Sequence, residues 1–294
     1  MGHHMHNIPA IFFHRGNSNG RFAIQQALQY NRRVILLGDE TSKLPIGEYH
    51  AYQDHDEGAL QFVGVFQHMN TAPNPSHDLH CFLRWFFIFN LMKEQQFQRV
   101  FAGDTDVLLY ADVTEIADEW GDHEILLSVP VRQDNYRWAV AGTSSYWSYN
   151  GLRLFLDFLF QLYTTPTRLQ QLQEKWHWHQ RTGAPGGVCD MTALYLFHQE
   201  YPELIGSLIS VTGSPPHAFD LSINAAENCY PDEYKVHRPS MAPYGQFKQL
   251  EWIDQQPYGY NLRLQQLVRF DGVHFQGGAK CIIPDCLKMR QSDG

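Results

Sequence analysis

Two aspartates separated by one residue follow an apolar segment near the middle of the chain. Residues 99–102 have the composition of a buried strand, and Asp104 and Asp106 come directly after Gly103. Side chains at positions i and i+2 of an extended segment point to the same side, so both carboxylates would face one point. Neighbouring carboxylates repel each other unless a cation lies between them, and oxygen ligands suit Mg²⁺ or Mn²⁺. The spacing therefore predicts a divalent-cation site, with a solvated turn rich in Asp as the alternative.

A second group of chemically useful residues lies near the C-terminus. Residues 273–280 contain His274, the pair Gly277 and Gly278, and Lys280. Glycines let a backbone approach a phosphate closely, a lysine supplies a mobile positive charge, and an imidazole can complete a metal site. In the alternative interpretation, His274 caps a strand and Lys280 is solvated.

The elements that must position these residues follow from the apolar pattern. Apolar segments at 8–13 and 34–37 flank a helical pattern at 22–30, which is typical of a βαβ unit with parallel strands. Because ligands collect outside the carboxyl ends of such strands, Asp104 and Asp106 would lie at that edge. We therefore predict an α/β fold, with a mostly parallel sheet flanked by helices in a single domain. Further helices are expected at 79–93, 151–163, 166–178 and 191–201, further strands at 107–110, 124–129 and 208–211, and surface connections around a few short strands over 213–271.

Composition excludes several classes of protein. The 294 residues are 44% hydrophobic and 18% charged, an ordinary globular balance. A net charge of -9 lacks the positive field that binding to nucleic acid requires. Five cysteines without paired short spacings indicate reduced thiols in a cytoplasmic protein. The most apolar stretch, 82–92, is too short for a transmembrane segment and is interrupted by Arg84 and Asn90.

Together, these segments resemble a glycosyltransferase of the GT-A fold. The resemblance rests on the order of the segments: a first strand, a polar loop, a helix with Arg84, the aspartate pair and a closing motif near the C-terminus. The closing segment is similar to the His-x-x-Gly-x-x-Lys motif of the glycogenin and lipopolysaccharide galactosyltransferase family, and His274, Gly277 and Lys280 match that motif. The resemblance implies a Rossmann-like, mixed and mostly parallel sheet. It divides the chain into a disordered or vector-derived tail (1–7), a GT-A-like domain (8–283) and a C-terminal tail (284–294).

The resemblance also implies a role for each matched residue. Asp104, Asp106 and His274 would hold Mn²⁺ or Mg²⁺, and imidazole in the shell favours Mn²⁺. The substrate-binding residues would be Phe13 and His14 against the base and ribose, Arg84 against the nucleotide sugar, Asp104 near the ribose, and Gly277 and Lys280 at the diphosphate. The alternative for Arg84 is an arginine whose stem covers a buried helix while its head stays in water.

Asp190 is the candidate catalytic residue. It opens the apolar helix at 191–201, where related enzymes have an acidic residue that contacts the donor sugar or the acceptor, and the alternative is a helix N-cap. Met191 stands where that family usually carries Gln, so retention or inversion at the anomeric carbon stays open. If the reaction inverts, Asp190 is the carboxylate that could serve as the base.

Other candidates carry less chemistry. His177 and His179 would diverge on a helix, which favours packing or surface roles. Cys189 has no histidine at a telling spacing, which favours an inert thiol. Four aromatic side chains could stack on a sugar ring, or could instead be buried in the protein core. They are Trp138, Tyr146, Trp147 and Tyr149.

The resemblance thus implies an enzyme that moves a sugar from a nucleoside-diphosphate sugar to an acceptor hydroxyl. UDP is the most frequent donor nucleotide in the family that the chain resembles. One alternative is a sugar-nucleotide nucleotidyltransferase. Such an enzyme needs a glycine- and arginine-rich phosphate loop after the first strand, and residues 14–20 resemble such a loop only loosely. The other is a non-catalytic protein of the same fold that binds nucleotide or sugar. The donor sugar, the acceptor and the oligomeric state stay open.

Overall fold

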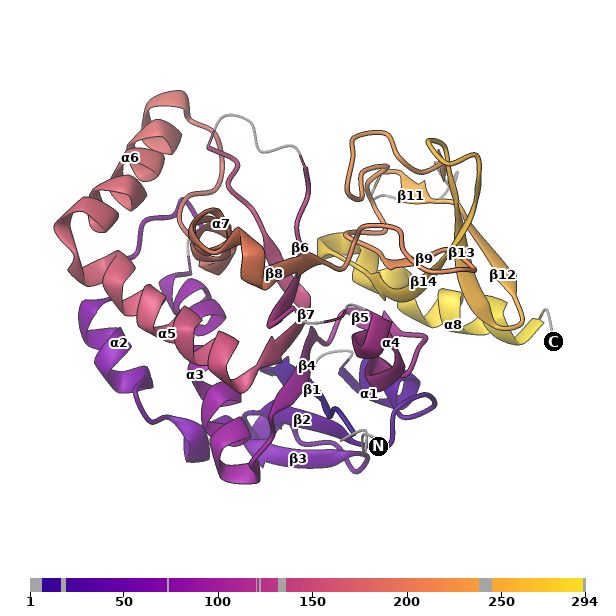
Figure 1. Ribbon diagram of the computed structural model, residues 1–294, viewed down its shortest axis with the longest axis horizontal. Coiled ribbons are helices and arrows are strands. Elements are labelled where there is room, and N and C mark those ends of the chain that lie inside the picture. The colour runs from indigo at the N-terminus through magenta and orange to yellow at the C-terminus, as the bar shows by residue number, and fades with distance from the viewer. Residues whose placement is uncertain are drawn as a thin grey trace.

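A seven-stranded sheet forms the centre of the computed structural model (Figure 1). The structure describes residues 7–16, 20–72, 74–119, 121, 123–131, 136–237 and 245–292, with no side chains described for 289–292. Within these residues the strand order is β3-β2-β1-β4-β7-β6-β8, and β7 alone runs against its neighbours. The predicted α/β fold with a mostly parallel sheet is confirmed. The strands are β1 (Ala10–His14), β2 (Val34–Gly38), β3 (Glu48–Ala51), β4 (Arg99–Asp104), β6 (Ile125–Ser128), β7 (Ala141–Ser148) and β8 (Ile205–Ser207).

Helices cover both faces of this sheet because its strands are apolar on both sides. In β1, Ala10 and Phe12 belong to one buried cluster and Ile11 to the other. The first cluster includes side chains of α1 (Gly20–Ala27), α4 (Val113–Glu119) and α8 (Ile283–Ser292). The second includes side chains of α2 (Ala59–Val65), α3 (Pro75–Gln95), α5 (Tyr149–Thr164), α6 (Pro166–Thr182) and α7 (Asp190–Glu200).

Helix α3 carries several residues of the site and has clear start and stop signals. The Asn74 side chain accepts a hydrogen bond from the His77 N–H, and Pro75 occupies the first turn. Gln96 ends the helix with a left-handed φ of 56°. Its long apolar middle is buried, and no described helix is long and apolar enough to cross a membrane.

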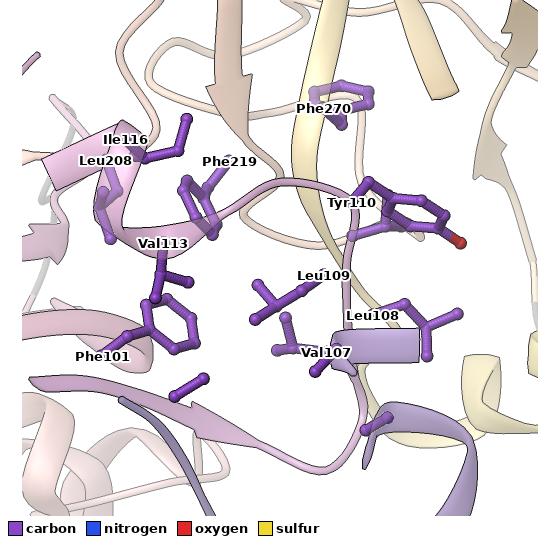
Figure 2. Packing of buried hydrophobic residues seen from close by; sticks show 14 of the residues in the cluster. Phe101, Val107, Leu108, Leu109, Tyr110, Val113, Ile116, Leu208, Phe219 and Phe270 are labelled. Carbon is purple, nitrogen blue, oxygen red and sulfur yellow. The ribbon is translucent and has the colours of Figure 1, made fainter. Parts of the chain in front are cut away.

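A second sheet begins immediately after the aspartate pair. After Asp106 the chain leaves the first sheet. Strand β5 (Val107–Leu109) pairs antiparallel with β14 (Gln266–His274), so that His274 lies opposite Val107. Phe101 of β4, the β5 residues, Phe219 and Phe270 belong to one apolar cluster (Figure 2). The remaining strands around it are β9 (His217–Phe219), β12 (Leu250–Ile253) and β13 (Gln256–Asn261), and a separate pair is formed by β10 (Val236–His237) and β11 (Phe247–Lys248).

The C-terminal part differs from the expectation in two places. The strand expected at 208–211 is instead β8, which ends at Ser207. The segment 213–271 has the expected short strands, β9 to β12, but it also contains the long β13–β14 hairpin. Its polar residues suggested exposure, yet Asp271 is buried beside His217 and Arg269. Helix α8 covers most of the expected C-terminal tail, and residues 1–6 of the expected N-terminal tail lie outside the described residues.

A buried histidine joins the second sheet to α4. His217 of β9 hydrogen-bonds the Asp271 carboxylate through Nδ1, and its Nε2 lies 2.6 Å from Oε2 of Glu119. These two carboxylates, Asp271 foremost, raise the pKa of His217 above its ordinary value of 6.5, against the opposing effect of burial. Arg269 contacts the other oxygen of Asp271 at 2.8 Å.

This arrangement makes stability depend on pH. The contribution of the imidazolium is present in full below the unfolded pKa of about 6.5 and is lost as pH rises through the higher folded pKa. We expect His217→Gln to remove part of the fall in unfolding free energy between about pH 6 and about pH 9, measured by urea denaturation. His177→Gln on the exposed face of α6 is the matched control and should follow the wild type. An unchanged pH profile in His217→Gln would contradict this assignment.

Candidate active site

A pocket of about 230 Å³ lies at the carboxyl ends of β1 and β4. It therefore occupies the edge of the sheet at which the sequence places a ligand. A larger cavity, of about 1060 Å³, lies beside Pro9 and Arg99, where β1 and β4 begin, and Tyr149 is the one candidate from the sequence among the described residues that line it. The lining of the smaller pocket comprises Phe13, His14, Arg15, His77, His80, Cys81, Arg84, Asp104, Thr105, Asp106 and Lys280.

The two aspartates line this pocket with different partners. Asp104 ends β4, but Thr105 and Asp106 form a turn, so the expected extended geometry of the pair is wrong. Oδ1 of Asp104 accepts a hydrogen bond of 2.5 Å from Arg84. Oδ2 of Asp106 lies 3.0 Å from Nζ of Lys280, and its Oδ1 lies 3.7 Å from Nε2 of His274. The two carboxylates therefore contact different positively charged side chains, Arg84 for Asp104 and Lys280 for Asp106.

Strand pairing brings His274 to Asp106 across 168 positions of sequence. The β5–β14 register sets His274 opposite Val107, and the N–H of Phe275 donates to the carbonyl of Asp106 at 2.9 Å. Nδ1 of His274 lies 2.7 Å from the carbonyl oxygen of Leu221, which can only accept, so Nδ1 carries a proton. Such a hydrogen bond fixes the ring and leaves Nε2 facing the carboxylate.

A buried ion pair supports the segment that holds His274. Nζ of Lys248 lies 2.7 Å from Oδ1 of Asp220, and both side chains are fully buried. The other oxygen of Asp220 accepts from the backbone N–H of His274, and Lys248 also donates to the carbonyls of Ser222 and Glu227. The ion pair thus ties the 220–227 loop to the end of β14.

Burial and neighbouring charges shift the pKa values of both aspartates. Burial is the largest influence on Asp104, and together with the charge of Asp106 it raises the pKa to about 6, although Arg84 opposes the shift. For Asp106, burial alone would raise the pKa, but His274 and Lys280 outweigh it and lower the pKa to about 2. Burial lowers the pKa of His274 and Asp106 raises it, with a net increase.

The donor atoms at Asp106 and His274 suit a divalent cation. Oδ1 of Asp106 is buried and has no hydrogen-bond partner within the described residues, which is costly for a carboxylate oxygen. It lies beside an imidazole nitrogen, and carboxylate oxygen with imidazole nitrogen is a donor set that Mn²⁺ accepts. Asp104 is turned toward Arg84, and no group of three metal-binding side chains is assembled in the described part of the chain. Asp106 and His274 therefore fit a metal as a pair.

Arg84 bridges two carboxylates from different parts of the fold. Its Nη1 contacts Asp104 and its Nη2 contacts Oδ2 of Asp190 at 2.6 Å. Burial would lower the pKa of the guanidinium, but the two aspartates raise it further than burial lowers it. The head group is buried and paired, so the alternative of a solvated head on an apolar stem is wrong.

Asp190 is the first residue of α7 and does not cap it. Cys189 is the N-cap, with Thr192 completing a capping box, so the N-cap alternative for Asp190 is wrong. The Asp190 carboxylate is buried against Arg84, and Asp190 is not among the described residues that line the pocket. The predicted catalytic residue thus reaches the site through the guanidinium.

Phe13 and His14, the predicted contacts for the base and ribose, line the pocket. Phe13 stacks on Phe87 with ring centroids 6.1 Å apart, and Nδ1 of His14 lies 2.7 Å from the Thr105 hydroxyl. Burial lowers the pKa of His14. Residues 17–19 of the expected phosphate loop lie outside the described residues.

Gly277 starts the short helix η4 (Gly277–Ile282) that carries Lys280. Its φ of 57° is left-handed, although an added Cβ would meet nothing within 4 Å. Backbone conformation rather than crowding therefore favours glycine at this position. The turn leaves the side chain of Lys280 about half exposed beside Asp106.

Three pocket residues of α3, His77, His80 and Cys81, are not among the site residues predicted from the sequence. His77, Cys81 and Arg84 follow the i, i+4, i+7 spacing of one helix face, and His80 lies beside them. That periodicity, counted backward from Arg84, would have identified them. Burial raises the pKa of the Cys81 thiol and lowers that of His80.

The weaker candidates fall outside the pocket. Tyr146 and Trp147 are buried in the core, and Tyr149 stacks on Phe89. His177 is exposed, and His179 contacts the carbonyl of Ala184. Burial raises the pKa of the Cys189 thiol, as expected for an inert cysteine. Trp138 is half-buried among other rings.

Comparisons with known proteins found similarity in structure only. No protein-family model and no curated protein matches the sequence. Among solved structures, the apo form of mouse xyloside xylosyltransferase 1 is similar over 68% of this chain and 84% of its own, at 14% identity and a TM-score of 0.49. The galactosyltransferase LgtC, solved with donor and acceptor sugar analogues, is similar over 68% of this chain and 73% of its own, at 13% identity and a TM-score of 0.37. The apo bifunctional glycosyltransferase WbbM is similar over 54% of this chain and 35% of its own, at 13% identity and a TM-score of 0.36.

Proposed function

We propose that this protein is a metal-dependent glycosyltransferase that uses a nucleoside-diphosphate sugar, with UDP as the donor nucleotide. The observation that carries the proposal is the position of the Asp106 carboxylate between Nε2 of His274 and Nζ of Lys280 at the edge of a parallel sheet. An anionic oxygen, an imidazole nitrogen and a mobile ammonium together suit a cation–diphosphate complex. The free state of all five cysteines supports a cytoplasmic location.

The proposed reaction breaks the bond between the anomeric carbon and the diphosphate, joins that carbon to the acceptor oxygen and releases the proton of the acceptor hydroxyl. Negative charge then develops on the phosphate oxygens, and the ammonium of Lys280 would neutralise it. Asp106 and His274 are the proposed ligands of Mn²⁺ or Mg²⁺, which when bound would stabilise the same charge, and Asp104 would join them only by giving up its contact with Arg84. Phe13 and His14 are the proposed contacts for the base and ribose, and Gly277 lets the backbone before Lys280 approach the diphosphate.

Arg84 and Asp190 are the proposed groups on the sugar side of the site. The guanidinium is held by two carboxylates, so its direction is fixed before substrate binds. In an inverting reaction, Asp190 is the proposed base that takes the proton of the acceptor hydroxyl, which requires it to exchange its contact with Arg84. In a retaining reaction, Asp190 and Arg84 together orient the donor sugar.

Nucleotide binding that depends on metal is the first test. We expect UDP at about one hundred times its Kd to raise the melting temperature by about 5 °C when Mn²⁺ is present. With EDTA the rise should vanish, because phosphate and carboxylate would face each other without a cation. GDP and ADP in parallel identify the base, and a panel of sugar nucleotides assayed for Mn²⁺-dependent hydrolysis identifies the sugar.

Three outcomes decide between the proposal and its rivals. Mn²⁺-dependent release of sugar from a nucleotide sugar supports the transferase. Nucleotide binding without turnover of any donor, with varied acceptors present, indicates a non-catalytic binding protein. A melting shift by UDP that is equally large in EDTA would contradict the role of the metal.

A further inference from the structure

Four half-buried aromatic rings gather beside the start of α7. Tyr136 and Trp138 come from the segment that leads into β7, Trp178 from α6 and Tyr195 from α7. The Trp138 and Tyr195 rings are stacked, with centroids 5.6 Å apart and planes 12° apart. Tyr136 lies 4.8 Å from Trp138 and 5.9 Å from Trp178 between ring centroids. Tyr146 and Trp147 of the adjoining strand are, in contrast, buried in the core.

The backbone that presents two of these rings is unusual. Tyr136 has a φ of 56° and Trp138 a φ of 36°, and both values lie in the left-handed region. Bulky side chains rarely adopt this region, and two such residues within three positions persist only when the surroundings impose them. Strained backbone of this kind tends to occur at functional sites.

A buried lysine contacts the backbone of this segment. Nζ of Lys175 donates to the carbonyl oxygen of Arg137, between the two strained residues, at 3.1 Å, and to the hydroxyl of Thr192 on α7 at 2.8 Å. Neither acceptor is a carboxylate, so the buried ammonium is held at a desolvation cost. Burial lowers the pKa of Lys175 to about 8. The lysine thus fastens the 136–138 segment to the first turn of α7.

The rings adjoin the candidate active site through that same turn. The N–H of Val140 donates to the carbonyl of Met191 at 3.2 Å, and Met191 follows Asp190, whose carboxylate contacts Arg84. The exposed edge of the segment carries a charged pair, Arg137 and Glu227, with a shortest N–O distance of 3.0 Å. Aromatic rings and charged hydrogen-bonding groups therefore lie together, next to the residues proposed to contact the donor sugar.

We propose that Tyr136, Trp138, Trp178 and Tyr195 form the binding site for a saccharide, which serves as the acceptor of the transferred sugar. One face of a pyranose ring consists of C–H groups and its rim of hydroxyls, which matches rings bordered by Arg137 and Glu227. Tyrosine and tryptophan supply rigid contact area at low entropic cost. The part of this proposal that concerns transfer rests on the proposed function, whereas saccharide binding does not.

Saturation-transfer NMR with maltose, cellobiose and lactose as probes tests the site directly. We expect at least one disaccharide to receive saturation at its ring C–H protons, and Trp138→Ala to weaken its binding roughly tenfold. Trp138→Phe should restore part of the affinity because it returns an aromatic face. Trp176→Ala is the matched control, because this indole lies on α6 and packs against the second core cluster instead. Circular dichroism establishes that each variant is folded.

The outcomes separate this proposal from the proposed function. If none of the three disaccharides binds, or if Trp138→Ala binds as well as the wild type, the saccharide site is overturned. An equal loss in Trp176→Ala also overturns it, since the effect would then be structural. If a disaccharide binds with the expected pattern while UDP with Mn²⁺ gives no melting shift, the saccharide site stands and the transferase proposal fails.

Discussion

Asp106→Asn is expected to reduce sugar-nucleotide turnover by about a hundredfold or more. The amide loses the negative charge that attracts a cation and keeps only one acceptor oxygen in place of two. In aspartate, the buried Oδ1 has no hydrogen-bond partner among the described residues and lies beside His274. In asparagine, this position is taken either by an uncharged amide oxygen or by an NH₂ group, which cannot bind a metal. We expect the Mn²⁺-dependent melting shift with UDP to disappear in the same variant, as measured by differential scanning fluorimetry.

Asp112→Asn is the matched control for this substitution. Oδ1 of Asp112 accepts from the N–H of Thr114 at the start of α4, outside the pocket, and asparagine caps a helix about as well as aspartate. This variant should bind UDP and turn over its donor like the wild type. Undiminished, metal-dependent UDP binding by Asp106→Asn would show that Asp106 is not a metal ligand.

Arg84→Met is expected to lower the free energy of unfolding by about 3–5 kcal/mol. The arginine is buried and compensates the carboxylates of Asp190 and Asp104, the first of which is itself buried. Methionine fills similar space without the charge, so a carboxylate is left in the interior without a partner. Turnover should fall as well, because the direction of both carboxylates depends on the guanidinium. Guanidinium chloride denaturation measures the loss.

Arg168→Met provides the control for a less buried ion pair. Arg168 contacts Glu200 at 2.7 Å with side chains 23% and 36% exposed, and the expected loss is below about 1 kcal/mol. In the double variant Arg84→Met/Asp190→Asn, part of the stability should return, since the stranded charge is removed. If Arg84→Met and Arg168→Met lower the free energy of unfolding equally, the contacts of Arg84 with Asp104 and Asp190 do not have the stabilising effect expected of a buried ion pair.

Local pattern predicts much of this fold. The strands around Ile11, Leu36 and Phe101 are continuous apolar runs, and the helix that contains Arg84 has an apolar middle with a proline at its start. The end of the central strand at Gly103 therefore places the aspartate pair at the edge of the sheet. These features depend on neighbouring residues only, and a single sequence contains that information.

Contacts between distant residues account for what the sequence does not predict. Strand β14 contains Arg269 and Asp271, which look exposed in the sequence, but His217 and Arg269 itself neutralise the buried aspartate. In β7, the polar Ser145 is buried, and its hydroxyl lies within hydrogen-bond distance of the carbonyls of Ala102 and Gly142. No local pattern reveals such partners, so polar strands are mistaken for loops.

The candidate site shows the same division. The family resemblance selected Asp106, His274 and Lys280, and the β5–β14 pairing accounts for their proximity. The partnership of Arg84 with Asp190 across 106 positions has no sequence signal, because neither residue has a charge partner at helical spacing. The predicted extended geometry of the aspartate pair is wrong, because a turn at Thr105 and Asp106 separates the two carboxylates.

The position of Mn²⁺ in crystals grown with UDP is the most direct test of the central claim. Anomalous scattering locates manganese independently of the protein atoms. We predict a single peak in direct contact with a carboxylate oxygen of Asp106 and Nε2 of His274, with the diphosphate reaching Nζ of Lys280. A manganese peak elsewhere, with UDP bound and Asp106 still paired only with Lys280, would contradict the account.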